Sequence, residues 1–132
     1  MTEFAFTETV DVRYQDHDTM GHVNNATYVT YMEEARTKYL RDELGVPADE
    51  LSMVVAHIEV DFVRSVQYAD EVTVAVSVTD LGESSFTMAY ELRDGEGVVA
   101  EGETVQVVLD PETGTSTPIP EAWRESIRVV EG

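Results

Sequence analysis

The sequence predicts an α+β domain in which one long helix packs against an antiparallel sheet. Apolar residues recur with the spacing of an amphipathic helix over residues 25–44. Five other segments alternate apolar and polar side chains, which is typical of half-buried strands. One strand precedes the helix and four follow it, and this order favours a helix layer on a sheet layer. The length of 132 residues suits a single domain over residues 1–132.

The first predicted strand covers residues 4–14, and the helix follows after a polar loop. The apolar face of this strand consists of Phe4, Phe6, Val10, Val12 and Tyr14. The apolar stripe of the helix consists of Tyr28, Val29, Met32, Ala35, Tyr39 and Leu40. On the opposite side of the helix, Glu34 and Lys38 have the i,i+4 spacing at which opposite charges attract. Gly45 and Pro47 are predicted to end the helix.

Four further strands are predicted after the helix. The alternating segments are residues 54–62, 72–79, 86–92 and 98–109. Residues 81–83 and the Asp-Gly-Glu-Gly sequence at 94–97 supply the turns between the later strands. Residues 110–114 end the last strand, and the tail over 121–131 is predicted to be either helical or extended.

The net charge excludes several classes of partner. Twenty-seven acidic residues face eight basic ones, which gives a formal net charge of −19, and the single lysine is Lys38. Such a chain is a poor partner for nucleic acid or for an anionic membrane surface. Because the acids are spread along the sequence, we expect a solvated surface adapted to high salt, as in a halophilic protein. The alternative is an ordinary acidic cytosolic protein.

Other functional classes are excluded by what the sequence lacks. There is no cysteine, which rules out disulfides, thiolate catalysis and cysteine-based zinc sites. No apolar run approaches the ~20 residues of a membrane span. The first residues carry no basic region followed by an apolar one, so we expect no secretion signal and a cytoplasmic location. Neither a Gly-x-Ser-x-Gly elbow nor a glycine-rich phosphate loop is present.

The densest group of reactive side chains lies in the loop before the helix. It contains Asp16, His17, Asp18, Gly21, His22, Asn24 and Asn25. Gly21 permits a positive φ angle, and Asn24 or Asn25 is a preferred helix N-cap. A carboxylate placed just before a helix faces unpaired backbone N–H groups, which bind developing negative charge. The loop is therefore the predicted reactive site.

Metal binding is a competing interpretation of the same loop. Asp16, Asp18 and Gly21 resemble the start of an EF-hand, but Met20 and Thr27 stand where the fifth and twelfth positions need oxygen ligands. A site built from Asp16, His17, Asp18 and His22 is chemically possible, although the spacing does not specify one. Elsewhere, His57 lies on the less apolar face of its strand with Glu59 and Asp61, and we expect it to be solvated or hydrogen-bonded in a structural role.

Three segments carry a family resemblance. They are residues 12–28 with the following Glu-Glu-Ala-Arg at 33–36, residues 60–64, and residues 100–104. In the residues of these segments and in their order along the chain, the sequence resembles the hotdog-fold acyl-CoA thioesterases of the 4-hydroxybenzoyl-CoA thioesterase type, over about residues 5–125. The resemblance implies a sheet of about five strands wrapped around the long helix. It also implies a homodimer or homotetramer with active sites between subunits. The fold gives a separate reason for such an assembly, because a lone sheet with one helix leaves an apolar edge and an apolar face that need cover.

The resemblance also implies roles for individual residues. The second acid of the Asp-x-Asp pattern is catalytic in that family, which here is Asp18, and the N–H that polarises the thioester carbonyl falls near Asn25. Gly21, His22 and Asn24 are expected to contact substrate or shape the loop. The candidates for binding the coenzyme A phosphates are Arg64, Arg93, Arg124 and Arg128. Of these four, Arg64 is the one predicted to bind substrate.

We therefore expect hydrolysis of an acyl-CoA to a carboxylic acid and coenzyme A. Asp18 would act as nucleophile or as general base, with the helix N-terminus as oxyanion site and with no metal or bound cofactor. The alternatives are a hotdog module that binds acyl groups without turnover, and a thioesterase acting on acyl-carrier protein. A different hotdog arrangement places the catalytic acid on the long helix, where Glu33 and Glu34 would be the candidates; both are expected on its outer side.

Overall fold

The computed structural model describes residues 4–46, 52–66 and 70–132. Its main elements are β1 (Phe6–Asp11), α1 (Asn25–Lys38), β2 (Met53–Phe62), β3 (Glu71–Leu81), β4 (Ser85–Asp94), β5 (Gly97–Val108) and α2 (Glu121–Glu131). A 3₁₀ turn, η1 (Tyr14–Asp16), follows β1, and a π-helical turn, η2 (Tyr39–Glu43), continues α1. The predicted order of one strand, one long helix and four strands is confirmed.

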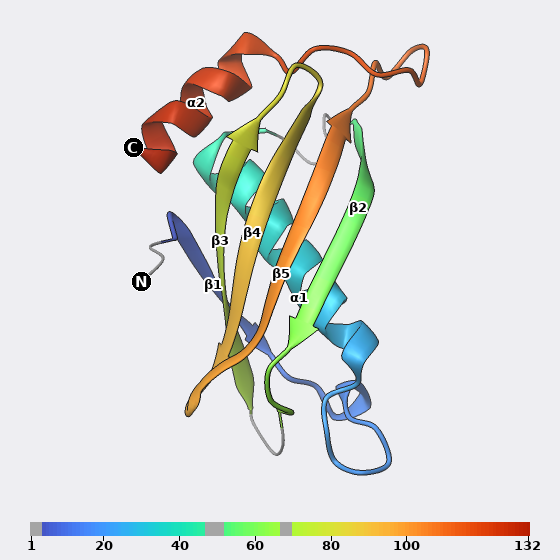
Figure 1. The fold of residues 1–132 in the computed structure, drawn as a ribbon, viewed down its shortest axis with the longest axis vertical. Coiled ribbons are helices and arrows are strands. Elements are labelled where there is room, and N and C mark those ends of the chain that lie inside the picture. Colours follow the sequence, from blue (N-terminus) through green and yellow to red (C-terminus); the bar gives the residue numbers. More distant parts are fainter. Residues whose placement is uncertain (1–3, 47–51, 67–69) are drawn as a thin grey trace.

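The five strands form one antiparallel sheet in the order β1-β3-β4-β5-β2. In Figure 1 the sheet lies in front of α1 and curves around it, so that α1 crosses behind the strands. This is the predicted hotdog arrangement. Among the described residues, no helix has the length and apolar content needed to cross a lipid bilayer.

The apolar faces of the strands and of the helix both turn toward the core between the sheet and α1. The buried core residues include Tyr28, Tyr31, Met32, Ala35 and Tyr39 from the helix side, and Val72, Val74, Val76, Phe86, Met88 and Leu92 from the sheet. The helix and the sheet approach closely at Gly102. A Cβ atom there would lie 2.7 Å from Met32 Cε and 3.2 Å from the Glu59 carbonyl oxygen. The helix packs on the sheet at this distance only because residue 102 has no side chain.

The first strand is shorter in the structure than predicted. The first strand ends at Asp11 instead of residue 14, and Tyr14, predicted on its apolar face, is 95 % exposed. The chain leaves the sheet here because the Arg13 N–H donates to the Asp16 carboxylate (2.9 Å) and the 3₁₀ turn begins. Gly45 has φ +69°, which confirms its predicted role after the helix, whereas Pro47 lies outside the described residues.

β2 is an edge strand, at the opposite side of the sheet from β1, and much of its apolar surface is exposed in the single chain. Val54, Ile58 and Phe62 are 48 %, 43 % and 47 % exposed. The pairing with β5 shifts by one residue between Val55 and His57, a β-bulge that interrupts the predicted alternation. An exposed apolar edge strand of this kind is a surface that proteins normally cover.

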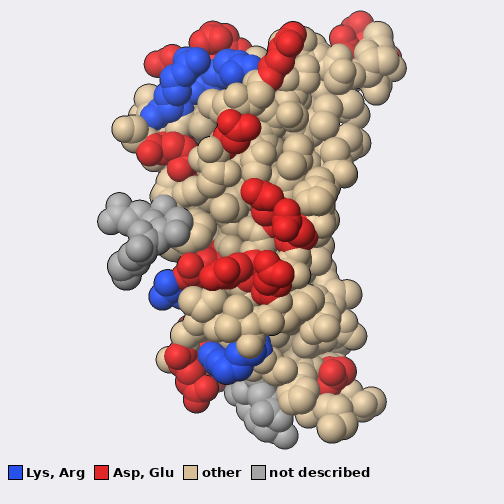
Figure 2. Space-filling model, in the orientation of Figure 1, with Lys and Arg blue, Asp and Glu red and all other residues tan. Residues whose placement is uncertain are grey.

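The sheet face turned away from α1 is strongly acidic. Figure 2 shows acidic side chains gathered across the middle of this face. The register explains the crowding, since Glu59 is paired with Glu103, and Glu101 is paired with both Asp61 and Glu91. Arg93 forms an ion pair with Glu91. Acids on neighbouring strands therefore lie side by side on one surface.

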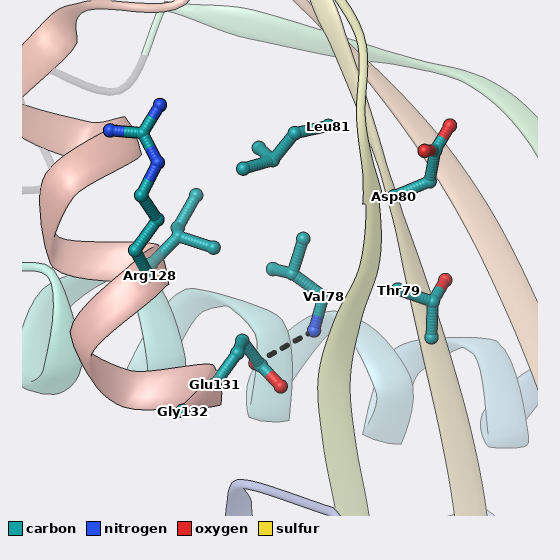
Figure 3. Close-up of a pocket in the computed structure, with 8 residues that line it drawn as sticks. Val78, Thr79, Asp80, Leu81, Arg128, Glu131 and Gly132 are labelled. Atoms are coloured by element: carbon teal, nitrogen blue, oxygen red, sulfur yellow. Dashed lines mark hydrogen bonds between the residues drawn. The ribbon is translucent and has the colours of Figure 1, made fainter.

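The tail over 121–131, predicted as helical or extended, is the helix α2. It packs beside β3 where that strand extends beyond its pairing with β1. The buried Ile127 anchors its apolar side. Glu131 accepts hydrogen bonds from the Val78 N–H (2.9 Å; Figure 3) and from the Tyr39 hydroxyl (2.5 Å). One carboxylate thus links α2, β3 and η2, and it satisfies an N–H on the open edge of β3.

Candidate active site

The loop between η1 and α1 is a compact turn closed by backbone hydrogen bonds. The Asp18 N–H donates to the His22 carbonyl (2.7 Å), and the Gly21 N–H donates to the Asp18 carbonyl (3.1 Å). Gly21 has φ +79°, a conformation that side chains disfavour. The prediction that Gly21 relieves the backbone at this point is confirmed.

The Asp18 carboxylate is exposed but held in one orientation. Its Oδ1 accepts hydrogen bonds from the N–H groups of Met20 (2.8 Å) and His22 (3.1 Å). Within the described residues, Oδ2 has no hydrogen-bond partner. The loop therefore fixes one carboxylate oxygen and leaves the other free for chemistry.

The start of α1 lies immediately after this loop. Asn24 is the N-cap, since its side chain accepts from the Ala26 N–H (2.9 Å) and its carbonyl accepts from the Thr27 N–H (2.9 Å). Asn25 is the first helical residue, and its N–H has no acceptor in the part of the chain that the structure describes. An unpaired N–H at a helix N-terminus is a donor with partial positive charge.

The loop is tied to the rest of the molecule at both ends. The Asn24 N–H donates to the Asp16 carbonyl (2.9 Å), and the Val23 N–H donates to the Val66 carbonyl (2.9 Å). Val66 in turn donates its N–H to the buried hydroxyl of Tyr28 (3.2 Å). The segment after β2 and the first turn of α1 thus hold the loop together.

Asp16 anchors the loop from inside the protein. Its side chain is buried and accepts from the Tyr31 hydroxyl (2.7 Å), the Arg13 N–H (2.9 Å) and the Arg13 guanidinium (3.4 Å). Burial by itself would raise the pKa of Asp16, but these three donors together lower it below its usual value. Burial, reinforced by the adjacent carboxylate, raises the pKa of Tyr31. The two aspartates of the loop therefore differ in environment, with Asp16 inside and Asp18 outside.

Tyr31 is the part of this arrangement that the sequence interpretation missed. It is 1 % exposed, although the apolar stripe predicted for the helix does not include it. Its spacing, three residues after Tyr28 and four before Ala35, was the available signal.

The loop borders an open hollow of about 890 Å³ lined by residues 14, 15 and 17–21. Tyr14 and Met20 stand beside it with 95 % and 70 % of their surface exposed. The hollow thus combines a carboxylate with two large exposed side chains that can contact a ligand or a partner.

The four arginines predicted as phosphate ligands all have protein partners. Arg64 forms two hydrogen bonds with Asp94 (2.6 and 3.0 Å), and Arg93 pairs with Glu91. Arg128 lies near two glutamates of α2, and Arg124 donates to carbonyls of the turn after β3. Arg64 follows β2 and is two residues from Val66, which contacts the loop; its guanidinium is oriented by Asp94.

The alternative metal site in the loop does not assemble. No three of Asp16, His17, Asp18 and His22 bring donor atoms within 4.8 Å of one another. The reason is that Asp16 points inward to Tyr31 while Asp18 binds the loop backbone. Glu33 and Glu34 are exposed on the outer side of α1, as predicted, and Glu34 lies 3.9 Å from Lys38.

Comparison with known protein families gives one match over most of the chain. Residues 12–127 match the model described as the thioesterase-like superfamily. A solved structure, a thioesterase from Thermus thermophilus complexed with coenzyme A and Zn, is 41 % identical with a TM-score of 0.89, covering 100 % of this chain and 98 % of that one.

Two curated relatives are also similar over most of their length. The uncharacterized protein YsmA of Bacillus subtilis is 31 % identical over 96 % of this chain and 87 % of its own. The acyl-CoA thioester hydrolase YbgC of Escherichia coli O157:H7 is 27 % identical over 84 % of this chain and 87 % of its own.

Proposed function

The chain belongs to the thioesterase-like superfamily, and from this premise we propose that it hydrolyses an acyl-CoA to a carboxylic acid and free coenzyme A. The observation that carries the proposal is the exposed, oriented Asp18 carboxylate in the loop that leads to the open N-terminus of α1. Thioester hydrolysis needs an attacking or activating group and a donor for the oxyanion, and this loop offers both. The coenzyme A in the Thermus relative and the activity named for the Escherichia relative support the substrate class.

Two chemical roles fit Asp18. As nucleophile, Oδ2 attacks the carbonyl carbon, the C–S bond breaks, coenzyme A leaves as a thiolate, and water hydrolyses the mixed anhydride. As general base, Oδ2 takes a proton from the water that attacks the carbonyl. In both, the N–H of Asn25 stabilises the oxyanion, and Gly21 allows the thioester to approach the loop closely.

The remaining predicted substrate contacts have specific places in this proposal. His22 holds Asp18 through its backbone, and Asn24 sets the direction of the first helical turn. Arg64 is the candidate for a coenzyme A phosphate. Asp94 and Glu96 both pair with its guanidinium, which orients the group and offsets its charge. We also propose that, within the superfamily, the chain is of the 4-hydroxybenzoyl-CoA thioesterase type.

Activity and site are tested together with Asp18→Asn, which keeps the shape of the side chain and removes its charge. We expect kcat/KM to fall about 10²–10⁴-fold with an unchanged melting temperature, since Asp18 is exposed and makes no buried contact. Glu33→Gln is the matched control, because it removes an exposed acid from the outer side of α1. Near-native turnover in Asp18→Asn together with loss in Glu33→Gln or Glu34→Gln would move the catalytic acid to the helix.

The same assay separates the proposed hydrolase from its alternatives. Thiol release is followed with a thiol reagent on aliphatic and aromatic acyl-CoAs, including 4-hydroxybenzoyl-CoA, and on an acylated carrier protein. Binding of acyl-CoA without any thiol release would identify a non-catalytic acyl-binding module. Thiol release from the acylated carrier protein alone would identify a thioesterase that acts on acyl-carrier protein.

We further propose that residues 1–132 act as one domain in a homodimer or homotetramer. The exposed apolar side chains of β2, with Tyr14 and Met20 beside the loop, form surface that a second subunit would cover. Light scattering in high salt tests this, and an active monomer would refute it.

The acidic surface supports a further proposal, adaptation to high salt. Coenzyme A carries several negative phosphates, so an unscreened chain with net charge −19 should repel it. We expect thermal stability and turnover to rise between ~0.1 and ~2 M KCl, as the Debye length falls from about 10 Å to under 3 Å. If neither changes, the high-salt interpretation is wrong while the fold and the site assignment are unaffected.

A further inference from the structure

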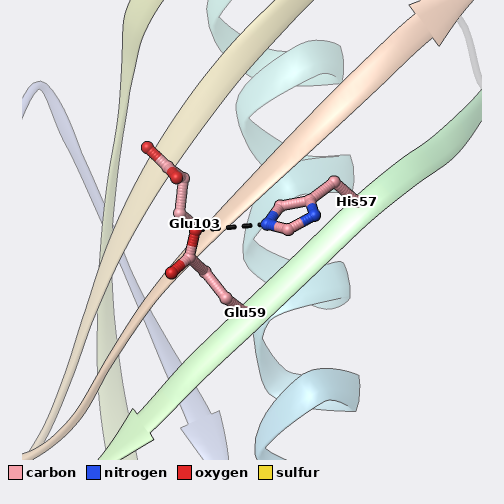
Figure 4. A group of neighbouring side chains, drawn as sticks. All are labelled: His57, Glu59 and Glu103. Atoms are coloured by element: carbon pink, nitrogen blue, oxygen red, sulfur yellow. Dashed lines mark hydrogen bonds and ion pairs between the residues drawn. The ribbon is translucent and has the colours of Figure 1, made fainter.

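Away from the loop, three metal-binding side chains meet on the outer face of the sheet. His57 and Glu59 lie on β2 and Glu103 lies on β5 (Figure 4). The ligand atoms of the three residues all lie within 4.8 Å of one another, and His57 Nε2 is 3.1 Å from Glu59 Oε1. His57 is hydrogen-bonded, as predicted, but this grouping of donors was not predicted.

The strand pairing forces these residues together. Glu59 is directly opposite Glu103 in the antiparallel pair, and His57 is two residues before Glu59, so it points to the same face. The bulge between Val55 and His57 comes just before this group and sets its register. Because the donors stand on two paired strands, their backbone positions are fixed before any ligand binds.

Without a bound cation, Glu59 and Glu103 place like charges opposite one another, and His57 is hydrogen-bonded to Glu59. Like charges directly opposite one another on paired strands destabilise a sheet. The next outward positions are also acidic, since Asp61 is paired with Glu101 and Glu101 with Glu91. Several acids on one face concentrate cations from solution around the group. Both the local pair and its surroundings therefore favour a bound positive ion.

We propose that His57, Glu59 and Glu103 bind one divalent transition-metal ion, with Zn²⁺ as the best fit. A tetrahedral zinc with bonds of about 2.0–2.2 Å places its ligand atoms roughly 3.4 Å apart, with water in the fourth position. The 3.1 Å between the His57 and Glu59 donors is already close to this spacing. An imidazole ligand favours zinc over Mg²⁺ or Ca²⁺, which prefer oxygen ligands alone.

The ion would link the edge strand β2 to its neighbour β5. It would replace the repulsion between Glu59 and Glu103 with two metal–oxygen bonds that bridge β2 and β5. The site lies on the sheet face turned away from α1, so it has no part in the hydrolysis proposed for Asp18. It neither depends on the proposed function nor supports it.

The test is a calorimetric titration of the chelator-treated full chain with Zn²⁺ in ~2 M KCl containing excess Mg²⁺, which suppresses diffuse binding to the acidic surface. We expect one zinc per chain and a higher melting temperature with zinc. His57→Gln and Glu103→Gln should each weaken binding at least about tenfold and abolish the thermal shift. Without zinc, Glu103→Gln should melt no lower than the parent chain, because it removes a repulsion.

Two variants serve as controls. Glu101→Gln removes the same charge from the same face of the same strand without removing a ligand, and it should bind zinc like the parent chain. His17→Gln removes an imidazole from the loop and should also leave zinc binding unchanged. The proposal is overturned if excess Mg²⁺ eliminates zinc binding, if Glu101→Gln weakens it as much as Glu103→Gln, or if His17→Gln abolishes it.

Discussion

The contact between Asp16 and Tyr31 should stabilise the loop before α1, and a double-mutant cycle can measure its contribution. Tyr31→Phe removes only the hydroxyl that donates to the carboxylate at 2.7 Å, and the fully buried ring is kept, so no cavity forms. Asp16→Asn removes the charge while the side chain keeps its size. A hydrogen bond to a charged group contributes about 1.5–3 kcal/mol, which is the expected cost of Tyr31→Phe.

The two changes should not be additive. Without the charge of Asp16, the hydroxyl of Tyr31 contributes little to the free energy of unfolding. The double variant should therefore be destabilised by less than the sum of the losses in the two single variants. The expected coupling is about 1.5–3 kcal/mol, at the upper end for residues in contact. Urea unfolding of the four proteins at pH 7, followed by circular dichroism, measures it. A coupling near zero would show that the contact does not stabilise the loop.

The same pair predicts a pH dependence whose sign follows from the lowered pKa of Asp16. Its stabilising effect should be complete above the pKa of an unfolded aspartate, about 3.9, and should disappear as the pH falls through the lower folded-state pKa. The stability difference between the parent chain and Asp16→Asn should therefore shrink only below about pH 4. In the proposed acyl-CoA hydrolysis, Asp16→Asn should lose less activity than Asp18→Asn, because Asp16 is buried and positions the loop.

Two predictions concern the packing around the sheet. Gly102→Ala should destabilise the chain by about 1–3 kcal/mol, because its Cβ would lie 2.7 Å from Met32 Cε and 3.2 Å from a backbone oxygen. In a Met32→Ala background the same Gly102→Ala change should cost less in thermal unfolding, because the clashing side chain is gone, and an equal cost would contradict the assigned clash. Glu131→Gln should cost about 1–3 kcal/mol, since a neutral amide accepts more weakly from the Val78 N–H and the Tyr39 hydroxyl. An unchanged urea midpoint would mean that this carboxylate does not hold α2 in place.

The sequence by itself determined the parts of this protein that depend on local spacing. The alternation of apolar residues identified the strands and the periodicity identified the helix, because each pattern reflects which side chains a regular backbone points at the core. Turn and cap chemistry is also local. For this reason the positive φ of Gly21 and an N-cap at Asn24 or Asn25 could be predicted within one loop, and the structure has the cap at Asn24.

Only the tertiary structure decided which distant residues meet. Asp16 and Tyr31 are 15 positions apart, and nothing in the loop itself distinguishes the buried Asp16 from the exposed Asp18. Arg64 pairs with Asp94 because the end of β2 and the β4–β5 hairpin lie at the same end of the sheet. Glu59 faces Glu103 because β5 pairs with β2 in a particular register, bulge included. These contacts depend on chain topology and strand register, which arise from packing of the whole chain and leave no signature in the short-range spacing of residues.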